Sequence, residues 1–455
     1  MTSQISALWA GTRRTATRGL IVLVFALAAG VGRPAAAALP PGNSVQQWNQ
    51  IAENTVVSSG AFQSEGLIYM AYVSSAVYNA TVAIHGGYAP YGAGVVAARG
   101  ASTDAAVIEA AYDTLVNYFP AQSATLYASY TEALALVPDG IAKSNGQAVG
   151  LAAATALIQS RVGDGRMTPI GVTSLFPTHT PAAGVWRLTP GAYAAPQTPW
   201  VGDVRPFVLD SADKFLPPPP PALDSDTWQR VFAEIQLYGA ANSTVRSTEQ
   251  TAVAKFWTAN VIRQYNRVVR DLIDARALSL TRSARLAAMM NVIGADSLIS
   301  CLHAKYHYLF WRPVTAIDPT SVNPSGDGFG PVPGFDDGIA ATVEQIGWRP
   351  LVTTPNHPEY PAAHGAITSA IAEVLSEFLD SDWINIDVHG FDATGAAGNL
   401  NAVRHYDRVS DLRREIVGAR LWAGLHYRTS SEAGVTLGRR VAAYDLHHAF
   451  QEIEH

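Results

Sequence analysis

The sequence is poor in cysteine and in charge, and both shortages narrow the class of protein. Cys301 is the one cysteine among 455 residues, so no internal disulfide can form. Charged residues make up 15% of the chain and the net charge is −6, which gives no indication of a nucleic-acid surface. No segment repeats at the period of about 20 to 50 residues that is typical of solenoids. A hydrophobic fraction of 48% over this length predicts a globular protein of two packed units or one large helical assembly.

The N-terminus carries a targeting pattern. Arg13 and Arg14 stand before an apolar run at 20–29, and small residues follow up to Ala38. This order is typical of a secretory signal peptide, because the run is shorter than the roughly 20 apolar residues of a membrane-spanning helix. The paired arginines also hint at twin-arginine export. We therefore expect residues 1–38 to be a signal peptide and the mature chain to be secreted or periplasmic, without a stable membrane anchor.

Helical periodicity dominates the mature chain. Apolar residues recur at helical spacing in eight segments: 44–58, 64–85, 104–118, 121–137, 141–162, 225–239, 247–260 and 279–311. Ser247 to Gln250 has the form of a helix capping box. Many prolines and glycines separate the fifth segment from the sixth, and five consecutive prolines among them favour an extended connector. We predict an all-α protein with an N-terminal half at 39–223, whose connector is 163–223, and a C-terminal half at 224–455.

The first candidate site is a basic pair in the C-terminal half. Lys305 and Arg312 are seven residues apart, so on one continuous helix both lie on one stripe, about 10 Å apart along the axis. Aromatic neighbours would partly desolvate the pair, and two such cations attract an anion. The alternative is a pair of solvated surface charges. His303 and His307, four residues apart, lack an acidic third ligand nearby, and we expect them to be packing residues.

The stretch HPEYPAAHG, from His357 to Gly365, is the second candidate. Its prolines prevent a regular helix upstream, so we expect a helix to begin at 362–364. The free N–H groups of a first helical turn form an anion site. His364 at this place can give a proton to a ligand oxygen or take one from it. The alternative is a histidine that only caps the helix.

The third candidate is the pair Arg420 and His426. These residues are six apart, which on an ideal helix places them about 120° out of line. They therefore reach a common target either by side-chain length or through a bend at Gly424. Taken alone, this pair indicates little.

Together, the three motifs resemble the signature of a known superfamily. In order along the chain they are Lys305-x6-Arg312-Pro313, Pro361-x-x-His364 and Arg420-x5-His426. This arrangement is similar to that of the vanadium-dependent haloperoxidases and type 2 phosphatidic acid phosphatases, in particular to the bacterial haloperoxidase-like branch. The likeness is close over residues 300–440 and looser upstream. It implies a fold of two helical bundles, of which the second carries the site.

The resemblance implies a role for each motif residue. The groups that would bind the equatorial oxygens of a tetrahedral oxyanion are Lys305, Arg312, Arg420 and the backbone N–H of Ala363. His364 would be the acid–base group, and His426 would take the apical position. If the anion is vanadate, a ring nitrogen of His426 is its ligand, and hydrogen peroxide oxidises a halide to hypohalous acid, which halogenates a small organic acceptor.

The same set of residues also suits a phosphate ester. His426 would then attack phosphorus, the three cations would stabilise the five-coordinate transition state, and His364 would protonate the leaving oxygen. A non-catalytic relative that only binds an anion is a third hypothesis. We expect a vanadate-dependent haloperoxidase first and a secreted, acid-phosphatase-like hydrolase second. The oligomeric state is open between a monomer and a homo-oligomer.

Several positions depart from the family pattern. Ala362 and Ala363 replace the usual Ser and Gly, and losing that serine hydroxyl removes a hydrogen bond of about 1.5 to 3 kcal/mol to a charged partner. Ala419 and Ser430 replace a Ser and an Asp around the third motif. In the phosphatases that aspartate orients the histidine, so its absence argues against fast ester hydrolysis. His357 stands where bromide-oxidising relatives have His and chloride-oxidising ones have Phe, which favours bromide or iodide. A bond from its side chain to its own backbone is the alternative.

Overall fold

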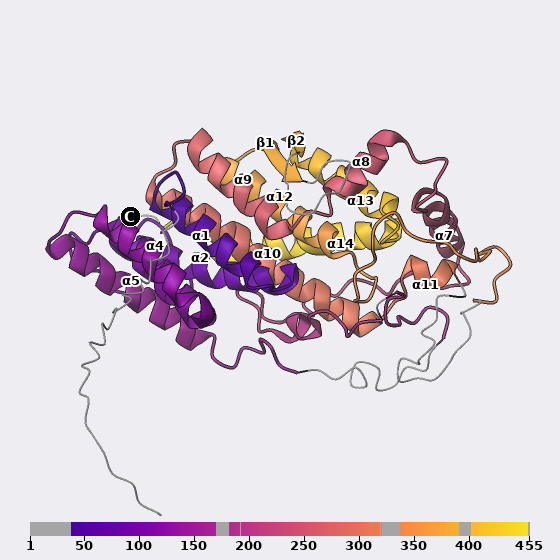
Figure 1. Ribbon diagram of the computed structural model, residues 1–455, viewed down its shortest axis with the longest axis horizontal. Coiled ribbons are helices and arrows are strands. Elements are labelled where there is room, and N and C mark those ends of the chain that lie inside the picture. The colour runs from indigo at the N-terminus through magenta and orange to yellow at the C-terminus, as the bar shows by residue number, and fades with distance from the viewer. Residues whose placement is uncertain are drawn as a thin grey trace, which may run out of the picture. The chain divides into compact units, whose positions relative to one another are not determined.

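The structure is a computed structural model that describes residues 38–169, 182–191, 193–318, 320, 337–390 and 402–453 (Figure 1). Ala38 to His455 form one compact unit. The predicted signal peptide lies outside the described residues, apart from Ala38. The predicted connector is described except at 170–181 and 192, and its five prolines are neither helix nor strand, as expected.

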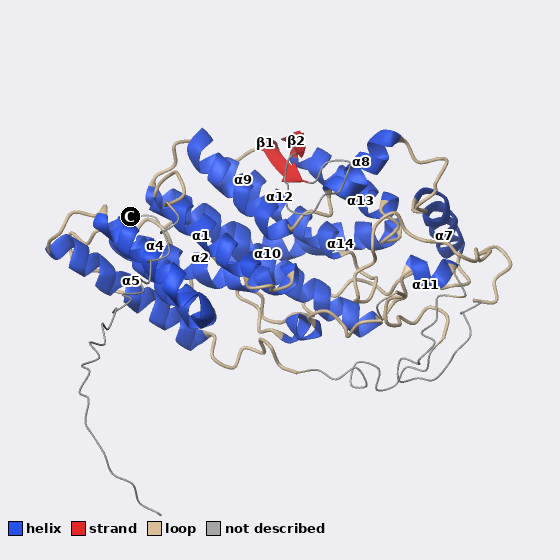
Figure 2. Cartoon of the chain, viewed as in Figure 1, coloured by secondary structure: helices blue, strands red, loops and turns tan. Residues whose placement is uncertain are grey.

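Helices make up most of the described chain, which confirms the all-α prediction (Figure 2). The α-helices before the connector are α1 (Ser44–Ser58), α2 (Gln63–His85), α3 (Thr103–Tyr118), α4 (Ser123–Ala135) and α5 (Ile141–Ser160). Those after it are α7 (Asp226–Tyr238), α8 (Thr248–Phe256), α9 (Val261–Ala275), α10 (Leu280–Tyr308), α11 (Pro313–Ile317), α12 (Ala363–Leu379), α13 (Val409–Trp422) and α14 (Arg428–His448). Short 3₁₀ helices are η1 (Pro120–Gln122) and η2 (Pro199–Asp203).

Capping side chains explain several helix boundaries. The Ser247 hydroxyl accepts a hydrogen bond from the backbone N–H of Gln250 at 3.1 Å, and the Gln250 side chain accepts one from the Ser247 N–H at 2.9 Å. The predicted capping box is therefore confirmed, and it starts α8. Asn260 caps α9 by accepting from the N–H of Ile262 at 2.9 Å. The helix α9 was not predicted. The segment 247–260 was interpreted as one helix, although Ser247 starts α8 and Asn260, at the end of the segment, starts α9.

Two long helices form the centre of the core. α10 is buried on nearly all sides and packs against α2, α12 and α14. α2 and α10 are long and apolar enough to cross a membrane, but 89% and 94% of their apolar windows are buried inside the protein. The largest hydrophobic cluster takes side chains from both sides of residue 223, such as Tyr72 and Ile299. The division into halves at that residue stays a prediction, since both sides share this core.

One hairpin interrupts the helical pattern. β1 (Trp383–Gly390) pairs antiparallel with β2 (Ala402–Arg408), and Ile386 lies opposite Tyr406. In β1, buried residues alternate with exposed ones, as in a strand with one face on the core. The hairpin was not predicted, although this alternation is readable in the sequence WINIDV.

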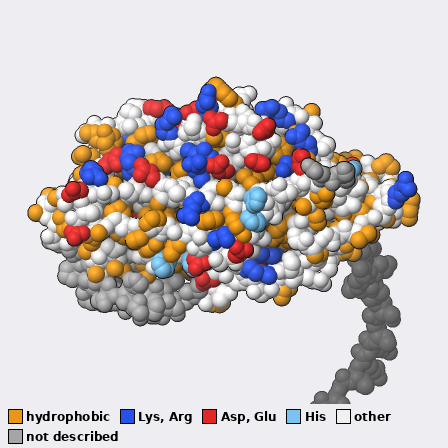
Figure 3. Space-filling model, turned by 180° about the vertical axis from the view of Figure 1, so that it is seen from behind, with side chains coloured by type: hydrophobic (Ala, Val, Ile, Leu, Met, Phe, Trp, Pro, Cys, Tyr) orange, Lys and Arg blue, Asp and Glu red, His pale blue; other side chains and the backbone are white. Residues whose placement is uncertain are grey.

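Charged side chains of both signs are mixed over the face shown in Figure 3. Exposed ion pairs such as Lys214 with Asp210, at 2.6 Å, contribute little to stability because water screens their charges. The cations of the three motifs are different, because all of them are buried.

Candidate active site

Lys305 and Arg312 lie in different elements, so the expectation of one shared helical stripe is wrong. α10 ends at Tyr308, because Leu309 takes a left-handed conformation with φ 48°. Arg312 is extended (φ −80°, ψ 151°), which the following Pro313 favours. Both side chains are nonetheless buried, with 0% and 1% of their residue surface exposed, and this excludes the alternative of solvated charges.

The first motif holds the second in place. Lys305 Nζ donates to the carbonyl oxygens of Pro358 at 2.9 Å and Glu359 at 2.8 Å. Arg312 Nε donates to the carbonyl oxygen of His357 at 2.9 Å. The two cations thus bind the backbone of the loop that leads into α12.

Arg312 also contacts two histidine rings and thereby fixes their tautomers. Its Nη2 lies 3.0 Å from Nδ1 of His357, and its Nη1 lies 3.2 Å from Nε2 of His426. A guanidinium can only donate, so both ring nitrogens accept. In the neutral rings, the proton of His357 is therefore on Nε2 and that of His426 on Nδ1. Nδ1 of His357 lies 3.2 Å from the carbonyl oxygen of Pro358, but it has no proton to donate to that oxygen. This argues against the alternative in which the His357 side chain only bonds to its own backbone.

The proton on His426 is bound by Glu359, a residue that the motif comparison missed. Glu359 Oε1 accepts from Nδ1 of His426 at 2.9 Å and from the N–H of Tyr427 at 3.0 Å. Its Oε2 accepts from the hydroxyl of Ser430 at 2.7 Å. Ser430 stands where the family pattern has an aspartate, so the carboxylate that orients the histidine comes from the second motif here. The available signal was an acidic residue two positions after His357, between two prolines.

α12 begins at Ala363, within the predicted range. Its N-cap is Ala362, whose side chain caps nothing and whose N–H donates to the carbonyl oxygen of Ser430 at 2.9 Å. His364 follows in the first turn and so is not the capping residue. Its Nε2 is buried and has no hydrogen-bond partner. A buried nitrogen of this kind is a candidate contact for a ligand.

The chain bends between Arg420 and His426, as the spacing required. α13 ends at Trp422, and Gly424 has φ 75°, a conformation that a residue with a Cβ rarely adopts. Arg420 is 2% exposed. Its Nη1 donates to the carbonyl oxygen of Trp257 at 3.2 Å, while its Nε is buried without a partner.

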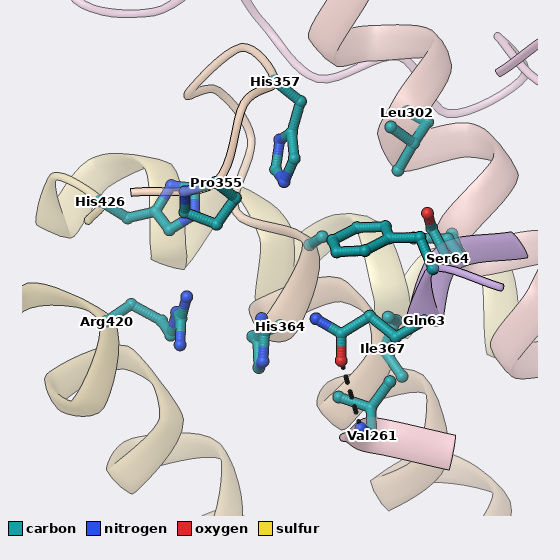
Figure 4. A pocket seen from close by; sticks show the side chains of 13 residues that line it. Gln63, Ser64, Val261, Leu302, Pro355, His357, His364, Ile367, Arg420 and His426 are labelled. Atoms are coloured by element: carbon teal, nitrogen blue, oxygen red, sulfur yellow. Dashed lines mark hydrogen bonds between the residues drawn. The ribbon is translucent and has the colours of Figure 1, made fainter. Parts of the chain in front are cut away.

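The motif residues meet around a narrow cavity of about 40 Å³, which has room for a few water-sized groups (Figure 4). Its polar lining residues are His357, His364, Arg420 and His426, together with Gln63 and Ser64 at the start of α2. Its apolar walls are Phe62, Val261, Leu298, Leu302, Pro355, Ala363 and Ile367. Lys305 and Arg312 are not part of this lining. None of the lining residues is acidic.

Burial shifts the pKa values of the ionisable groups at the site. It lowers the pKa of Lys305 to about 7 and that of Arg420 to about 9, and the charge of Arg312 adds to both shifts. Burial, together with nearby cations, also holds the pKa of His364 and of His426 well below the ordinary range. Both histidines are therefore neutral, and a bound anion would favour the charged forms of all these groups.

An aromatic cluster packs behind the motifs. Trp311 stacks on Trp228 with 5.8 Å between ring centroids, and Tyr427 meets the same Trp228 edge-on at 4.9 Å. Trp311 precedes Arg312 and Tyr427 follows His426 in the chain. The packing of these rings therefore restricts the movement of both functional residues.

His303 and His307 do not line the cavity. The expected packing role suits the half-buried His303 but is wrong for His307, which is exposed. His303 Nδ1 lies 3.3 Å from the carbonyl oxygen of Gly202, and His307 is exposed beside Tyr308. Within the described ranges, no group of three or more His, Cys, Asp or Glu side chains is placed to hold a metal ion.

Comparison with known proteins supports the resemblance. Residues 285–455 match the family model of the VCPO second helical-bundle domain. Over this region the chain is similar to that bundle domain. The chain is also 24% identical to the vanadium chloroperoxidase of Curvularia inaequalis in an alignment of 289 positions that covers 52% of this chain and 46% of that protein. The chain thus spans about half the length of this curated relative.

Solved haloperoxidase structures share the fold. A bacterial vanadium-dependent iodoperoxidase superposes with a TM-score of 0.72 at 21% identity, covering 92% of this chain and all of the other. A bacterial vanadium-dependent chloroperoxidase in its holo form gives 0.64 at 17% identity, covering 90% of this chain and 99% of the other. These structures show the haloperoxidase fold, and the family model and the curated relative support the resemblance found in the three motifs.

The donor set fits vanadate better than a bare metal ion. A bare cation needs several His, Cys or carboxylate ligands, and this cavity has cations and neutral imidazoles instead. An oxyanion brings its own oxygens, which can accept from the unpartnered Nε of Arg420, while the unpartnered Nε2 of the neutral His364 can accept a proton beside them. Nε2 of His426 carries the lone pair that could coordinate vanadium, and the ligand would replace the hydrogen bond that this nitrogen accepts from Arg312.

Proposed function

We propose that this protein is a vanadate-dependent haloperoxidase that uses hydrogen peroxide to oxidise bromide or iodide to hypohalous acid. The observation that carries the proposal is the cavity where His364, Arg420 and His426 converge while Glu359 orients His426 from behind. Bound vanadate supplies the Lewis acid that activates peroxide toward a halide. The haloperoxidase fold supports the same reaction.

Different side chains of this protein would orient the ligand histidine, stabilise charge on the anion and transfer protons. Glu359 holds the proton on Nδ1 of His426, so Nε2 keeps its lone pair for coordination. The buried cations stabilise negative charge on the ligand oxygens, and they do so strongly because the apolar walls exclude water. His364 is neutral, so its Nε2 takes a proton from hydrogen peroxide and returns it to the departing oxygen.

Halide preference and location are parts of the same proposal. His357 lines the cavity, and its protonated Nε2 is free to donate to an anion because Nδ1 accepts from Arg312. This supports bromide or iodide as substrate. The hypohalous acid then halogenates a small organic acceptor outside a cavity of this size. We propose that the mature enzyme acts outside the cytoplasm.

Vanadium loading tests this function directly. Purified protein is incubated with vanadate and dialysed, and the retained vanadium is measured together with peroxide-dependent bromination of a dimedone-type acceptor. We expect stoichiometric vanadium and bromination that requires vanadate, peroxide and halide together. Retained vanadium without oxidation of any halide would contradict the proposal.

The Glu359 contact favours a second candidate function, phosphate-ester hydrolysis through a phosphohistidine. A carboxylate that orients His426 prepares this ring for attack on phosphorus as well. The missing aspartate at position 430 therefore does not argue against hydrolysis as we expected. Hydrolysis of p-nitrophenyl phosphate that vanadate inhibits would support this function. Vanadate binding without either activity would identify an anion-binding relative.

A further inference from the structure

The start of α2 reaches the cavity from the opposite side of the three motifs. Phe62, Gln63 and Ser64 line the cavity together with His364 and Arg420. The segment lies about 240 residues before the first motif in the chain. No part of the signature describes it.

The amide of Gln63 has a fixed orientation. The backbone N–H of Val261 donates to Gln63 Oε1 at 3.3 Å. Because a backbone N–H can only donate, the oxygen of the amide must face Val261 and the NH₂ group must face away. Figure 4 shows this nitrogen pointing toward His364. Gln63 therefore presents a hydrogen-bond donor to the cavity.

The surroundings of this donor select for an anion. Arg420 is almost fully buried, lines the same cavity and has an unpartnered Nε. The Nε2 of His364 is also buried and unpartnered. Phe62 is the N-cap residue of α2 and provides no side-chain hydrogen bond, so the first-turn N–H groups add positive potential, which Glu65 in the same turn partly offsets. The nearby walls are apolar, which suits a large, weakly hydrated anion.

We propose that Gln63 is a halide-binding residue, whose amide NH₂ holds bromide or iodide beside His364 for oxidation. The inference rests on the proposed function and assigns to the N-terminal half a part in substrate binding. The Ser64 hydroxyl shares a 2.5 Å hydrogen bond with that of Thr198 in which either oxygen can be the donor, so the fixed donor on this side is the amide of Gln63.

Crystallography of the vanadium-free full chain tests the site without turnover. Crystals are soaked in sodium bromide, and bromide is located by its anomalous scattering. We expect a bromide within hydrogen-bond distance of Gln63 Nε2 in the wild type and its loss in Gln63→Glu, which keeps the acceptor for Val261 but replaces the donor by a negative charge. Bromide only at other positions, or unchanged bromide in the variant, would overturn the inference.

Kinetics give a second measurement on the vanadium-loaded enzyme. Gln63→Glu should raise the KM for bromide at least about tenfold, with the KM for peroxide and the retained vanadium nearly unchanged. Gln63→Met, neutral and similar in length, should shift the same constant less. The matched control is Gln47→Glu, since Gln47 bonds the carbonyl of Gly42 far along the chain from the motifs. Equal changes in both Gln→Glu variants would overturn the inference. A wild-type enzyme that oxidises no halide would instead overturn the proposed function. The role of Gln63 would then be tested by the position of bromide in the soaked crystals.

Discussion

Two buried clusters of ionisable side chains lie in this fold, one cationic and one of carboxyl groups, and both contain buried polar atoms without a hydrogen-bond partner. They differ in whether burial can remove the charge. Arg420 lines a cavity in which unpartnered nitrogens remain, and the buried Lys305 and Arg312 bind the loop that leads to it. Asp296 in α10 and Asp445 in α14 form a carboxyl cluster away from it. Asp296 accepts from three successive backbone N–H groups of the loop at 207–209, at 2.6 to 3.1 Å.

The two clusters differ in how they respond to burial: a buried carboxyl group can become neutral, whereas a buried arginine keeps its charge. Burial and the neighbouring Asp296 raise the pKa of Asp445 well above its ordinary range, so this carboxyl is neutral and needs no counter-ion. Its partner is satisfied by the backbone of a loop. Arginine cannot lose its charge in this way, so the cationic cluster is complete only with an anion. The predictions below test this contrast.

His426 should have the largest effect, because its Nε2 is the proposed vanadate ligand. We expect His426→Ala to lose retained vanadium and to lower halide oxidation at least about 1,000-fold. The measurement is metal content after dialysis together with bromination rate. His303→Ala is the matched control, since His303 lies outside the cavity, and it should keep both. Full vanadium binding by His426→Ala would show that the ligand is another residue.

Glu359→Gln should come next, because it removes the carboxylate that orients His426. We expect about 10- to 100-fold weaker vanadate retention, as for other outer hydrogen-bond partners of metal ligands. The change should be partly reversed by Ser430→Asp in the same chain, since the Ser430 hydroxyl is 2.7 Å from Glu359 Oε2. Glu234→Gln, which weakens an outer ion pair with Arg428, is the control and should have no such effect.

Lys305 should impose a pH dependence on anion affinity. Its pKa of about 7 means that the side chain loses its proton as pH rises through 7, so the site loses one cation. Vanadate affinity should then fall about tenfold between about pH 6 and 8. Lys305→Arg keeps the charge over this range and should flatten the curve relative to the wild type. Parallel curves for the two proteins would assign the dependence to vanadate itself.

The carboxyl cluster should change stability rather than binding. Burial raises the pKa of Asp296 to about 6 and that of Asp445 further, so the folded state binds protons that the unfolded state has released. The cluster's contribution to stability is therefore present at low pH and is lost as pH rises above about 4. Asp445→Asn removes this loss, and we expect the free energy of unfolding at pH 8 to rise by about 1 kcal/mol. Urea unfolding at pH 5 and 8 measures it, and an equal pH dependence in both proteins would contradict the assignment.

Local sequence signals predicted most of the helices but not the hairpin, α9, α13 or α14. Helical spacing and capping residues such as Ser247 act within one or two turns, so they are readable without the fold. The prediction that Lys305 and Arg312 share one helix was wrong, because the helix ends at the left-handed Leu309 between them. Helix ends of this kind usually have Gly or Asn, and a leucine gives no such signal in the sequence.

The sequence by itself determined the chemistry of this protein. The three motifs identify the cations and the two histidines of the candidate site. They can do so because residue type alone decides which side chains can carry a charge or a proton. The tertiary structure decided where the remaining contacts come from. Glu359 replaces an absent aspartate 71 positions away from it, and Gln63 enters from the other end of the chain. Such contacts depend on how helices pack, because hydrogen bonds join atoms that are close in space whatever their distance along the sequence.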